Sequence, residues 1–252
     1  MKKQTPNFYA VIIGTEILNG RREDRHFAFL RNSLLQRGWK LKASFVIEDD
    51  PLLIEKIFTL IKDDPKSVMF SFGGIGATPD DYTRAIAAKV FGDGKLYMHE
   101  EAKRRIIDRF GKDTYPHRIN MAMLPKDAKL LDNPINNVPG FYLHKRFFFV
   151  PGFPQMAHPM VEQVLDLFYP KAPKLYRLTI CVEASENDLL DIMKKIPEDI
   201  EFSSLPAIED NRYFDVISIA STDKKEAKHW MQFFINEVEK RGFRYKKAER
   251  CS

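Results

Sequence analysis

The chain has 252 residues, of which 44% are hydrophobic and 30% are charged, a composition typical of soluble globular proteins. At about 150 residues per domain, this length predicts one large domain or two modest ones that bury a core without disulfides or metal ions. The 40 Lys and Arg residues against 35 Asp and Glu give a net charge of +5, which is too small to indicate nucleic-acid binding by itself.

The composition also argues against membrane and secreted classes. The longest apolar stretches, such as Phe147–Val150, are far shorter than the roughly 20 residues that cross a bilayer. Pro6, Gly14 and Glu16 interrupt the apolar run that a signal peptide needs. The two cysteines show no metal-binding or redox spacing, whereas a secreted disulfide scaffold uses more of them. We therefore expect a cytoplasmic protein.

Residues 1–170 alternate short apolar strands with amphipathic helices. We expect strands at Phe8–Ile13, Leu41–Ile47, Val68–Phe72, Gly140–Leu143 and Phe147–Val150. Helical spacing of apolar residues predicts helices at Phe27–Leu34, Leu53–Ile61, Glu100–Phe110 and Val161–Phe168. Because strand–helix–strand order implies right-handed crossovers, the fold class is α/β, with three layers and a mostly parallel sheet covered by helices on both faces.

A linker at Pro170–Pro173 separates a second, smaller domain. After it, the pattern predicts a strand at Tyr176–Val182, a helix at Glu186–Ile196, strands at Ile200–Ser204 and Tyr213–Ala220, and a helix at Lys224–Lys240. This order indicates a small α+β domain with helices on one face of an antiparallel-rich sheet. We therefore divide the chain into domains at residues 1–170 and 174–245, followed by a basic tail at 246–252.

The segment Ser71–Thr83 carries the strongest functional pattern, with three glycines directly after an expected strand. Gly73, Gly74 and Gly76 follow this strand at the edge where parallel sheets bind their ligands. Closely spaced glycines let backbone N–H groups approach a phosphate without interference from a Cβ. The loop is therefore predicted to hold a phosphate-bearing ligand.

The residues after these glycines permit two interpretations. Thr78 fits a helix N-cap, Pro79 the first helical position, and Asp80 and Asp81 the first turn, where acids interact favourably with the helix dipole. However, two carboxylates beside a phosphate would repel it unless a cation lies between them. The combination therefore also predicts a divalent metal such as Mg²⁺ that bridges Asp80 and Asp81 to phosphate oxygens.

Two further polar segments follow the ends of neighbouring strands. In the run from Glu48 to Pro51, either Asp49 or Asp50 is expected to approach the glycine loop and join the metal ligands, or else to cap the following helix. The turn Gly14–Gly20 leaves the first strand at the same edge of the sheet. Its Glu16 is either a ligand contact or a surface acid.

These segments resemble, in order, the landmarks of the molybdopterin-binding domain superfamily. Gly14–Gly20 is similar to its GdELlsG segment, Ile47–Pro51 to VpDDp, and Gly73–Thr83 to GGlGPTpDDvT. Later landmarks match at Asn120–Pro125, Asn133–Pro134, Pro139–Phe141 and Val150–Met156. Their number and order make the resemblance specific.

Within the superfamily, the chain most resembles the CinA branch (competence/damage-inducible protein A) rather than the shorter MogA and MoaB proteins. Glu183–Glu186 and Ser204–Pro206 are similar to landmarks of the small KH-like middle domain of CinA, so the resemblance covers roughly residues 8–240. We expect the C-terminal amidohydrolase domain of full-length CinA proteins to be missing, because 252 residues leave no room for it.

The second domain is interpreted as an interaction or dimerisation module. KH domains clamp nucleic acid with a GxxG loop, and residues 175–245 contain only Gly242, so no nucleic-acid partner is expected. We expect a homo-oligomer, with an isologous dimer favoured and the trimer of MogA and MoaB relatives as the alternative.

The resemblance implies two chemistries, both with a pyrophosphate-bearing ligand over the glycine loop. CinA-type proteins of this architecture are similar to pyrophosphatases that split ADP-ribose and related dinucleotides with a divalent metal, whereas the MogA branch binds and adenylylates molybdopterin. We expect a metal-dependent nucleotide pyrophosphatase. The alternatives are a non-catalytic protein that binds molybdopterin or a nucleotide, and a molybdopterin adenylyltransferase.

The expected site follows from the residues that match these landmarks. Asp49 and Asp81 correspond to the functionally implicated acids of the family and are the expected catalytic residues. The expected metal ligands are Asp49, Asp50, Asp80 and Asp81. The expected phosphate and substrate contacts are Gly14, Glu16, Gly73, Gly74, Gly76, Thr78, Pro139, Gly140 and Gly152.

Six positions depart from the family pattern. Phe72 replaces a small or hydroxyl residue, Ala77 a Pro, His26 an Asn, Asn136 and Asn137 a Gly-Thr pair, and Gln155 a Glu. Because several of these positions lie at expected ligand contacts, they favour the alternative of binding without catalysis.

Overall fold

In the computed structural model, which describes residues 5–209 and 212–247, the chain divides into two units between Ala172 and Pro173. This boundary lies in the segment Pro170–Pro173, where the sequence predicts a linker. Each unit has its own sheet and its own cluster of buried hydrophobic side chains. No helix in the described part of the chain has the length and apolar composition needed to cross a membrane.

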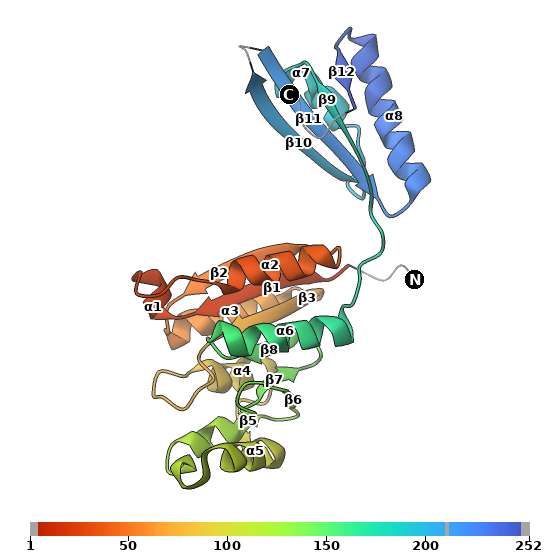
Figure 1. Ribbon diagram of the computed structural model, residues 1–252. Coiled ribbons are helices and arrows are strands. Elements are labelled where there is room, and N and C mark those ends of the chain that lie inside the picture. Colours follow the sequence, from red (N-terminus) through yellow and green to blue (C-terminus); the bar gives the residue numbers. More distant parts are fainter. Residues whose placement is uncertain (1–4, 210–211, 248–252) are drawn as a thin grey trace. The chain divides into compact units, whose positions relative to one another are not determined.

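The first unit is built on a six-stranded sheet (Figure 1). Its strands run in the order β2 (Leu41–Ile47), β1 (Asn7–Ile13), β3 (Ser67–Phe72), β8 (Phe147–Val150), β7 (Gly140–Leu143) and β6 (Lys129–Leu131). The first four are parallel, whereas β7 pairs antiparallel with both β8 and β6. The expected mostly parallel sheet is therefore confirmed, with an antiparallel extension at one side.

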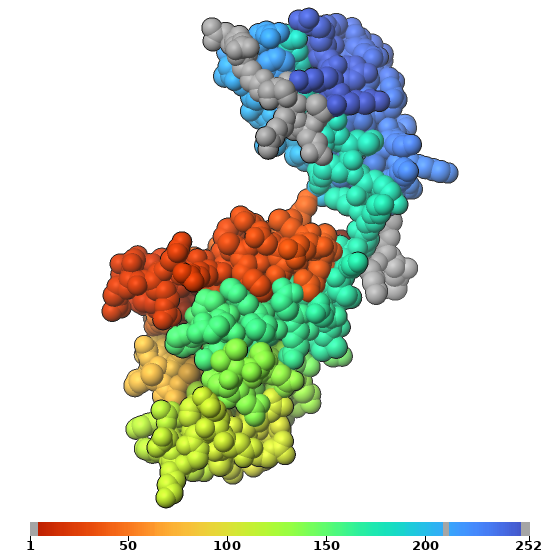
Figure 2. Space-filling view, in the orientation of Figure 1, coloured from red at the N-terminus to blue at the C-terminus, as the bar shows by residue number. Residues whose placement is uncertain are grey.

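One face of this sheet packs against α2 (His26–Gln36) and α6 (Pro154–Phe168). Side chains alternate along β1, and Phe8, Ala10 and Ile12 are buried on this face among apolar residues of both helices. Figure 2 shows α2, in orange, and α6, in green, side by side on this side of the unit.

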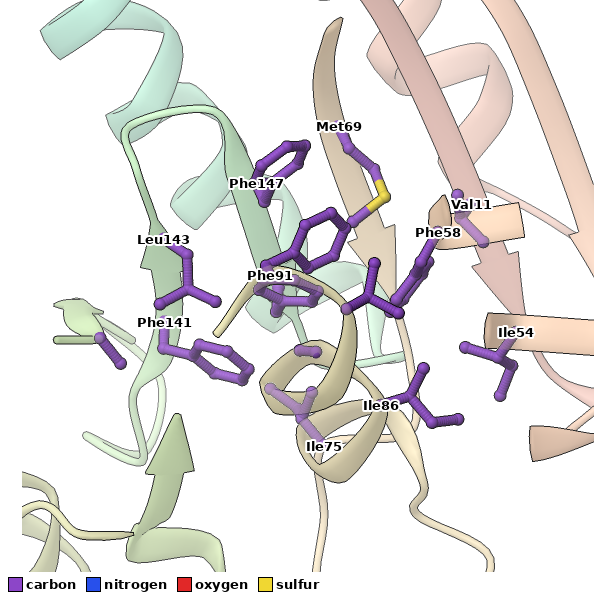
Figure 3. Close-up of a cluster of buried hydrophobic side chains, with 14 of the residues drawn as sticks. Val11, Ile54, Phe58, Met69, Ile75, Ile86, Phe91, Phe141, Leu143 and Phe147 are labelled. Carbon is purple, nitrogen blue, oxygen red and sulfur yellow. The ribbon is translucent and has the colours of Figure 1, made fainter. Parts of the chain in front are cut away.

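The opposite face packs against α3 (Pro51–Asp63) and α4 (Thr83–Phe91), with α5 (Glu100–Phe110) beyond them. Val11 of β1 points into this cluster, as Figure 3 shows. Phe91 stacks on Phe147 with ring centroids 3.9 Å apart, a geometry that contributes about 0.5–1.5 kcal/mol beyond the burial of apolar area. Helices on both faces complete the predicted three layers.

Several short elements have no counterpart in the sequence predictions. They are α1 (Thr15–Leu18), β4 (Leu96–Met98), β5 (Met123–Pro125), β6, and two 3₁₀ turns at Gly111–Thr114 and Arg118–Ala122. Segments of three to five residues are too short for hydrophobic periodicity to identify them.

The second unit is a four-stranded antiparallel sheet in the order β10 (Glu201–Glu209), β11 (Arg212–Ser221), β9 (Tyr176–Val182) and β12 (Tyr245–Lys246). The helices α7 (Glu186–Met193) and α8 (Lys224–Lys240) bury their apolar sides against one face of it. The predicted strand–helix–strand–strand–helix order is therefore observed.

Several boundaries in this unit differ from those predicted. Helix α7 ends at Met193 rather than Ile196, and β10 continues past Ser204 because it pairs with the whole length of β11. Lys246 pairs with Cys181 of β9, so the predicted basic tail, residues 246–252, begins inside the sheet. Residues 248–252 of that tail lie outside the described part of the chain.

Asp64, just after α3, gathers donors from three parts of the first unit. Its carboxylate accepts hydrogen bonds from the amide of Asn7 (2.7 Å), the hydroxyl of Tyr9 (2.8 Å), the ammonium of Lys42 (3.2 Å) and the N–H of Lys66 (2.9 Å). Burial of the carboxyl raises its pKa, but these four donors outweigh burial and hold the pKa well below its usual 3.8.

The first prediction concerns this cluster. Replacement Asp64→Asn should lower the free energy of unfolding by about 1–3 kcal/mol at pH 7, because an amide cannot accept all four hydrogen bonds. A carboxylate with a depressed pKa stabilises the folded state above its unfolded pKa of 3.8 and loses this contribution as the pH falls below that value. The gap between wild type and variant should therefore close in acid, as measured by urea denaturation between pH 7 and pH 2.

The control is Asp63→Asn, which removes a neighbouring, exposed carboxylate at the end of α3. This variant should unfold like wild type at every pH. Equal losses in the two variants would show that net charge, rather than the hydrogen bonds of Asp64, sets the stability.

Candidate functional site

The loops that follow β1, β2 and β3 lie together at one edge of the first sheet, and Figure 1 shows α1 at this edge directly after β1. The N–H of Gly14 donates to the carbonyl of Ile47 (3.0 Å) and joins the ends of β1 and β2. A Cβ on Gly73 would overlap the carbonyl oxygen of Ile13, so the turn after β3 lies against the end of β1. The structure thus brings the three predicted segments to one place.

The turn after β3 does not lead straight into a helix. Helix α4 begins at Thr83, so the predicted N-cap at Thr78 is wrong. Gly73 and Gly74 have φ angles of +96° and +68°, which suit glycine. Thr83 donates from Oγ1 to the carbonyl of Gly73 (3.0 Å) and from its N–H to that of Gly74 (3.0 Å). These bonds close the turn, and α4 therefore begins at Thr83 rather than directly after the glycines.

Asp81 holds the loop between the turn and the helix. Its Oδ1 accepts the N–H of Gly76 (2.9 Å), and its Oδ2 accepts both the N–H (2.7 Å) and the hydroxyl of Thr78. A Cβ on Gly76 would lie 2.6 Å from Oδ2 of Asp81, so this position also needs glycine. Asp80, by contrast, is exposed at the tip of the loop.

The two acids after β2 have different environments. Asp49 accepts the N–H (2.8 Å) and the hydroxyl (2.9 Å) of Thr15 on Oδ2, while its Oδ1 accepts no hydrogen bond from the described residues. Asp50 is the N-cap of α3, where its side chain accepts the N–H groups of Leu52 (2.8 Å) and Leu53 (3.4 Å). The capping interpretation is therefore correct for Asp50, and Asp49 keeps one carboxylate oxygen available to a ligand.

Three backbone N–H groups of the glycine loop are without a hydrogen-bond partner among the described residues. Within residues 5–209 and 212–247, the N–H groups of Gly74, Ile75 and Ala77 donate no hydrogen bond. Unpaired backbone N–H groups in a glycine-rich turn form an anion-binding concavity. The loop therefore has the donors that a phosphate requires.

Arg84 is a buried cation directly behind this loop. It is 7% exposed, and its guanidinium donates to the carbonyls of Asn120 and Gly76, the second at 2.6 Å. Burial lowers the pKa of Arg84 and the charge of Asp81 raises it, but a guanidinium stays protonated. No ion pair links Arg84 to a carboxylate in the described part of the chain, and its Nε has no hydrogen-bond partner there. The loop therefore lies over a positive charge.

Comparison with known proteins shows the family to which the first unit belongs. The family described as "Probable molybdopterin binding domain" matches residues 9–171. The chain belongs to this family. These residues include both the sheet of the first unit and the loops at its edge, so we refer to the first unit as the molybdopterin-binding domain.

The relatives place the chain with the CinA-like members of the family. A CinA-like protein of Syntrophotalea carbinolica is 32% identical over an alignment of 212 residues that covers 78% of this chain and 50% of that protein. A protein of Pyrobaculum calidifontis is 29% identical over an alignment of 203 residues that covers 76% of each chain. The crystal structure of CinA from Thermoplasma acidophilum, a protein described as of unknown function, is 28% identical with a TM-score of 0.58 and covers 64% of this chain and 97% of its own. This chain therefore spans about half the length of the first relative.

The remaining predicted contacts of the molybdopterin-binding domain lie at the same edge. Phe141 pairs with Phe149 across β7 and β8, which places Pro139 and Gly140 beside the end of β8. A Cβ on Gly140 would lie 2.7 Å from the carbonyl oxygen of Phe149, so packing alone requires this glycine. A Cβ on Gly152 would lie 3.5 Å from Cα of Gly73. The loop after β8 thus touches the glycine turn.

Two of the departures from the family pattern contact each other. The rings of His26 and Phe72 stack with centroids 4.4 Å apart. His26 is 3% exposed, and its Nε2 lies 3.3 Å from the carbonyl oxygen of Gly152. Because a carbonyl only accepts, Nε2 carries the proton, and Nδ1 has no partner among the described residues. The two changes therefore form one packing unit that supports the loop after β8.

The other departures lie on the loops themselves. Asn136 accepts the amide of Asn133 (2.6 Å) and the N–H of Val138 (3.0 Å), and Asn137 has a φ of +62°, a conformation that Asn tolerates. Ala77 carries one of the free N–H groups, which a Pro at that position would lack. Gln155 is exposed in the first turn of α6. Asn136 thus bonds within its own loop, and Ala77 adds one donor.

The four predicted metal ligands do not form a cluster. In the part of the chain that the structure describes, no group of three or more His, Cys, Asp or Glu side chains is arranged to hold a metal ion. A purely protein-bound metal centre therefore does not fit. Mg²⁺, however, is commonly held by one or two carboxylates together with substrate phosphates and water, and the free Oδ1 of Asp49 suits that arrangement.

Sequence reasoning did not identify Arg84 as part of the site. A signal was present, because an Arg within the run Thr83–Phe91 stands among apolar residues at helical spacing. Thr83, Ile86 and Ala87 are buried around it, so the side of α4 that carries Arg84 faces the protein interior. A charged residue on such a side needs a polar partner there.

A second prediction tests the role of Asp81 in the loop. Replacement Asp81→Asn leaves one acceptor oxygen and places an NH₂ group against donors, which should cost about 1–3 kcal/mol. Thermal unfolding should report this loss, and hydrogen exchange at the amides of Gly76 and Thr78 should accelerate. Asp80→Asn, at the exposed tip, should change neither. Unchanged exchange in the Asp81 variant would contradict this role.

A third prediction concerns acid stability. His158 on α6 stacks on Phe29 with centroids 3.7 Å apart, and burial, with a smaller contribution from His26, lowers the pKa of His158 to about 4. The His158 side chain of the unfolded state binds a proton more readily than that of the folded state. The free energy of unfolding is therefore at its full value above pH 6.5 and falls as the pH drops from 6.5 to about 4. His158→Gln should make this fall shallower in chemical denaturation, whereas His117→Gln, at an exposed site, should not. An equally steep fall in the His158 variant would contradict the assignment.

Proposed function

We propose that the molybdopterin-binding domain binds a ligand with a diphosphate group on the loop Gly73–Asp81, and that it hydrolyses a nucleotide pyrophosphate bond such as that of ADP-ribose. The observation that carries this proposal is the combination of free N–H groups at Gly74, Ile75 and Ala77 with the buried charge of Arg84 behind them. An anion on the loop would add counter-charge to that of Asp81, which acts on Arg84 without a direct ion pair.

The carboxylates define where a cation would be held. Oδ1 of Asp49 is available, whereas both oxygens of Asp81 accept hydrogen bonds from the loop. Asp49 would hold a divalent cation beside the phosphates, and such a cation would supply Lewis acidity and lower the pKa of an attacking water. In this proposal Asp49 is the residue that binds the cation, and Asp81 shapes the loop that binds the phosphates.

A second candidate function is binding without catalysis, of molybdopterin or of a nucleotide. Its support is that Phe72, Asn136 and Gln155 depart from the family pattern in or beside the segments expected to contact the ligand. Two further expectations from the sequence stay predictions. They are the homo-oligomer and the transfer of an adenylyl group to molybdopterin, on which no contact among the described residues bears.

The fourth prediction separates these functions. Asp49→Asn keeps an oxygen for the N–H and hydroxyl of Thr15 and replaces only the free oxygen by NH₂, which cannot bind a cation. With purified protein, ADP-ribose and Mg²⁺ or Mn²⁺, hydrolysis followed by chromatography of AMP should fall by about 100-fold or more in this variant, with an unchanged melting temperature. Glu48→Gln, at the exposed neighbouring position, should retain wild-type turnover.

The same experiment has distinct alternative outcomes. Saturable binding of ADP-ribose without turnover across a panel of dinucleotides and metal ions would favour the non-catalytic protein. Consumption of ATP that depends on molybdopterin would favour the adenylyltransferase. Equal turnover in wild type and Asp49→Asn would overturn the assignment of Asp49.

A further inference from the structure

An exposed aromatic side chain stands directly beside the glycine turn. Phe153 follows Gly152, where a Cβ would lie in van der Waals contact with Gly73. Phe153 is 47% exposed although its neighbours Val150 and Ala157 are fully buried. A half-exposed ring at a ligand-binding edge offers an apolar surface on which a second planar group can stack.

A planar cation is held over the same ring. The guanidinium carbon of Arg22 lies 5.2 Å from the centroid of Phe153, within the range of a cation–π interaction. The guanidinium of Arg22 forms an ion pair of 3.4 Å with the carboxylate of Glu16, and the backbone N–H of Arg22 donates to the backbone carbonyl of Glu16 (2.9 Å). The loop after β1 thus positions a flat cationic group against a flat aromatic group contributed by the loop after β8.

The guanidinium of Arg22 and the ring of Phe153 can bind the same kind of ligand group. An Arg guanidinium and a Phe ring both stack on planar heteroaromatic rings, and neither requires a particular pattern of hydrogen bonds on the ring. Inorganic pyrophosphate has no such ring, whereas nucleotides and pterins do. The side chains therefore suit the ring end of a ligand whose anionic end lies on the neighbouring loop.

We propose that Phe153 and Arg22 form a stacking platform for the heteroaromatic ring of the ligand whose diphosphate lies on the Gly73–Gly76 loop. This proposal rests on the proposed function of that loop and adds the part of the ligand that the glycine loop does not recognise. Glu16 then acts as a positioning residue for Arg22 rather than as a direct phosphate contact, since a carboxylate repels a phosphate.

The fifth prediction compares two ligands that differ in the ring. In isothermal titration calorimetry, Phe153→Ala should weaken the binding of ADP-ribose by about 5- to 100-fold, the range for loss of one base-stacking side chain. The affinity of the same variant for inorganic pyrophosphate should stay that of wild type. Phe153→Trp should retain the affinity for ADP-ribose, and fluorescence of the introduced indole should be quenched by ADP-ribose but not by pyrophosphate.

Two further variants and a pterin ligand serve as controls for this experiment. Tyr97→Ala removes a ring of similar exposure, 44%, on β4 and should change neither affinity. Arg22→Gln should weaken ADP-ribose binding more than pyrophosphate binding. Neopterin triphosphate, titrated in parallel, distinguishes a pterin from a nucleotide base as the ring that depends on Phe153.

The outcomes separate this proposal from the function on which it rests. If Phe153→Ala weakens ADP-ribose and pyrophosphate equally, Phe153 supports the loop and the platform is overturned while phosphate binding stands. If the variant leaves both ring-bearing ligands unaffected, the platform is overturned as well. If wild-type protein binds neither pyrophosphate nor a ring-bearing ligand, the proposed function of the loop fails, and the platform fails with it.

Discussion

Two glycines with positive φ carry the chain from β3 across the end of β1, and the geometry of the candidate site follows from this close approach. A side chain at Gly73 would overlap the carbonyl of Ile13, and one at Gly74 would overlap the hydroxyl of Thr83. Because backbone approaches backbone here, Thr83 can bond to both glycine carbonyls and α4 begins only at that residue. The segment between them is left as a loop in which the N–H groups of Gly76 and Thr78 donate to Asp81, and those of Gly74, Ile75 and Ala77 donate to no described residue.

The loop has one carboxylate that holds it closed and one buried cation behind it. The Asp81 carboxylate accepts the N–H groups that close the loop, and Arg84 lies behind it with its donors on backbone carbonyls. A buried guanidinium without a carboxylate partner is costly in the free protein, and an anion in front of the loop reduces that cost. The phosphate affinity proposed here is therefore built into the packing of α4 against the loop rather than into exposed lysines or arginines.

The departures from the family pattern have a common physical effect. His26 and Phe72 pack on each other and hold the loop after β8 through the carbonyl of Gly152. That loop carries Phe153 to the edge of the sheet, where Arg22 lies over its ring. Changes that look like losses of ligand contacts in the sequence thus support the position of an aromatic side chain at the same edge.

The sequence predicted the regular elements well because each contains enough residues to show its period. The strands Leu41–Ile47 and Tyr176–Val182 and the helices Glu100–Phe110 and Lys224–Lys240 have the predicted bounds. It also placed the glycine turn, Asp49 and Asp81 at one edge, because strands with apolar residues on both faces belong to a parallel sheet. Short elements such as β4, and the helix start after the glycine turn, were missed or misplaced, since hydrogen bonds between distant residues decide them.

The sequence by itself determined the fold class, the family and which segments meet at the ligand edge, because periodicity and motif order are local properties of the chain. Only the tertiary structure decided what each acid does: Asp50 caps α3, Asp81 binds its own loop, and Asp49 keeps a free oxygen. The same holds for Arg84 and Phe153, whose roles depend on burial and on neighbours far away in the chain. The sequence does not distinguish one aspartate from another. Their roles differ because the hydrogen-bond donors, the charges and the solvent exposure around each one differ.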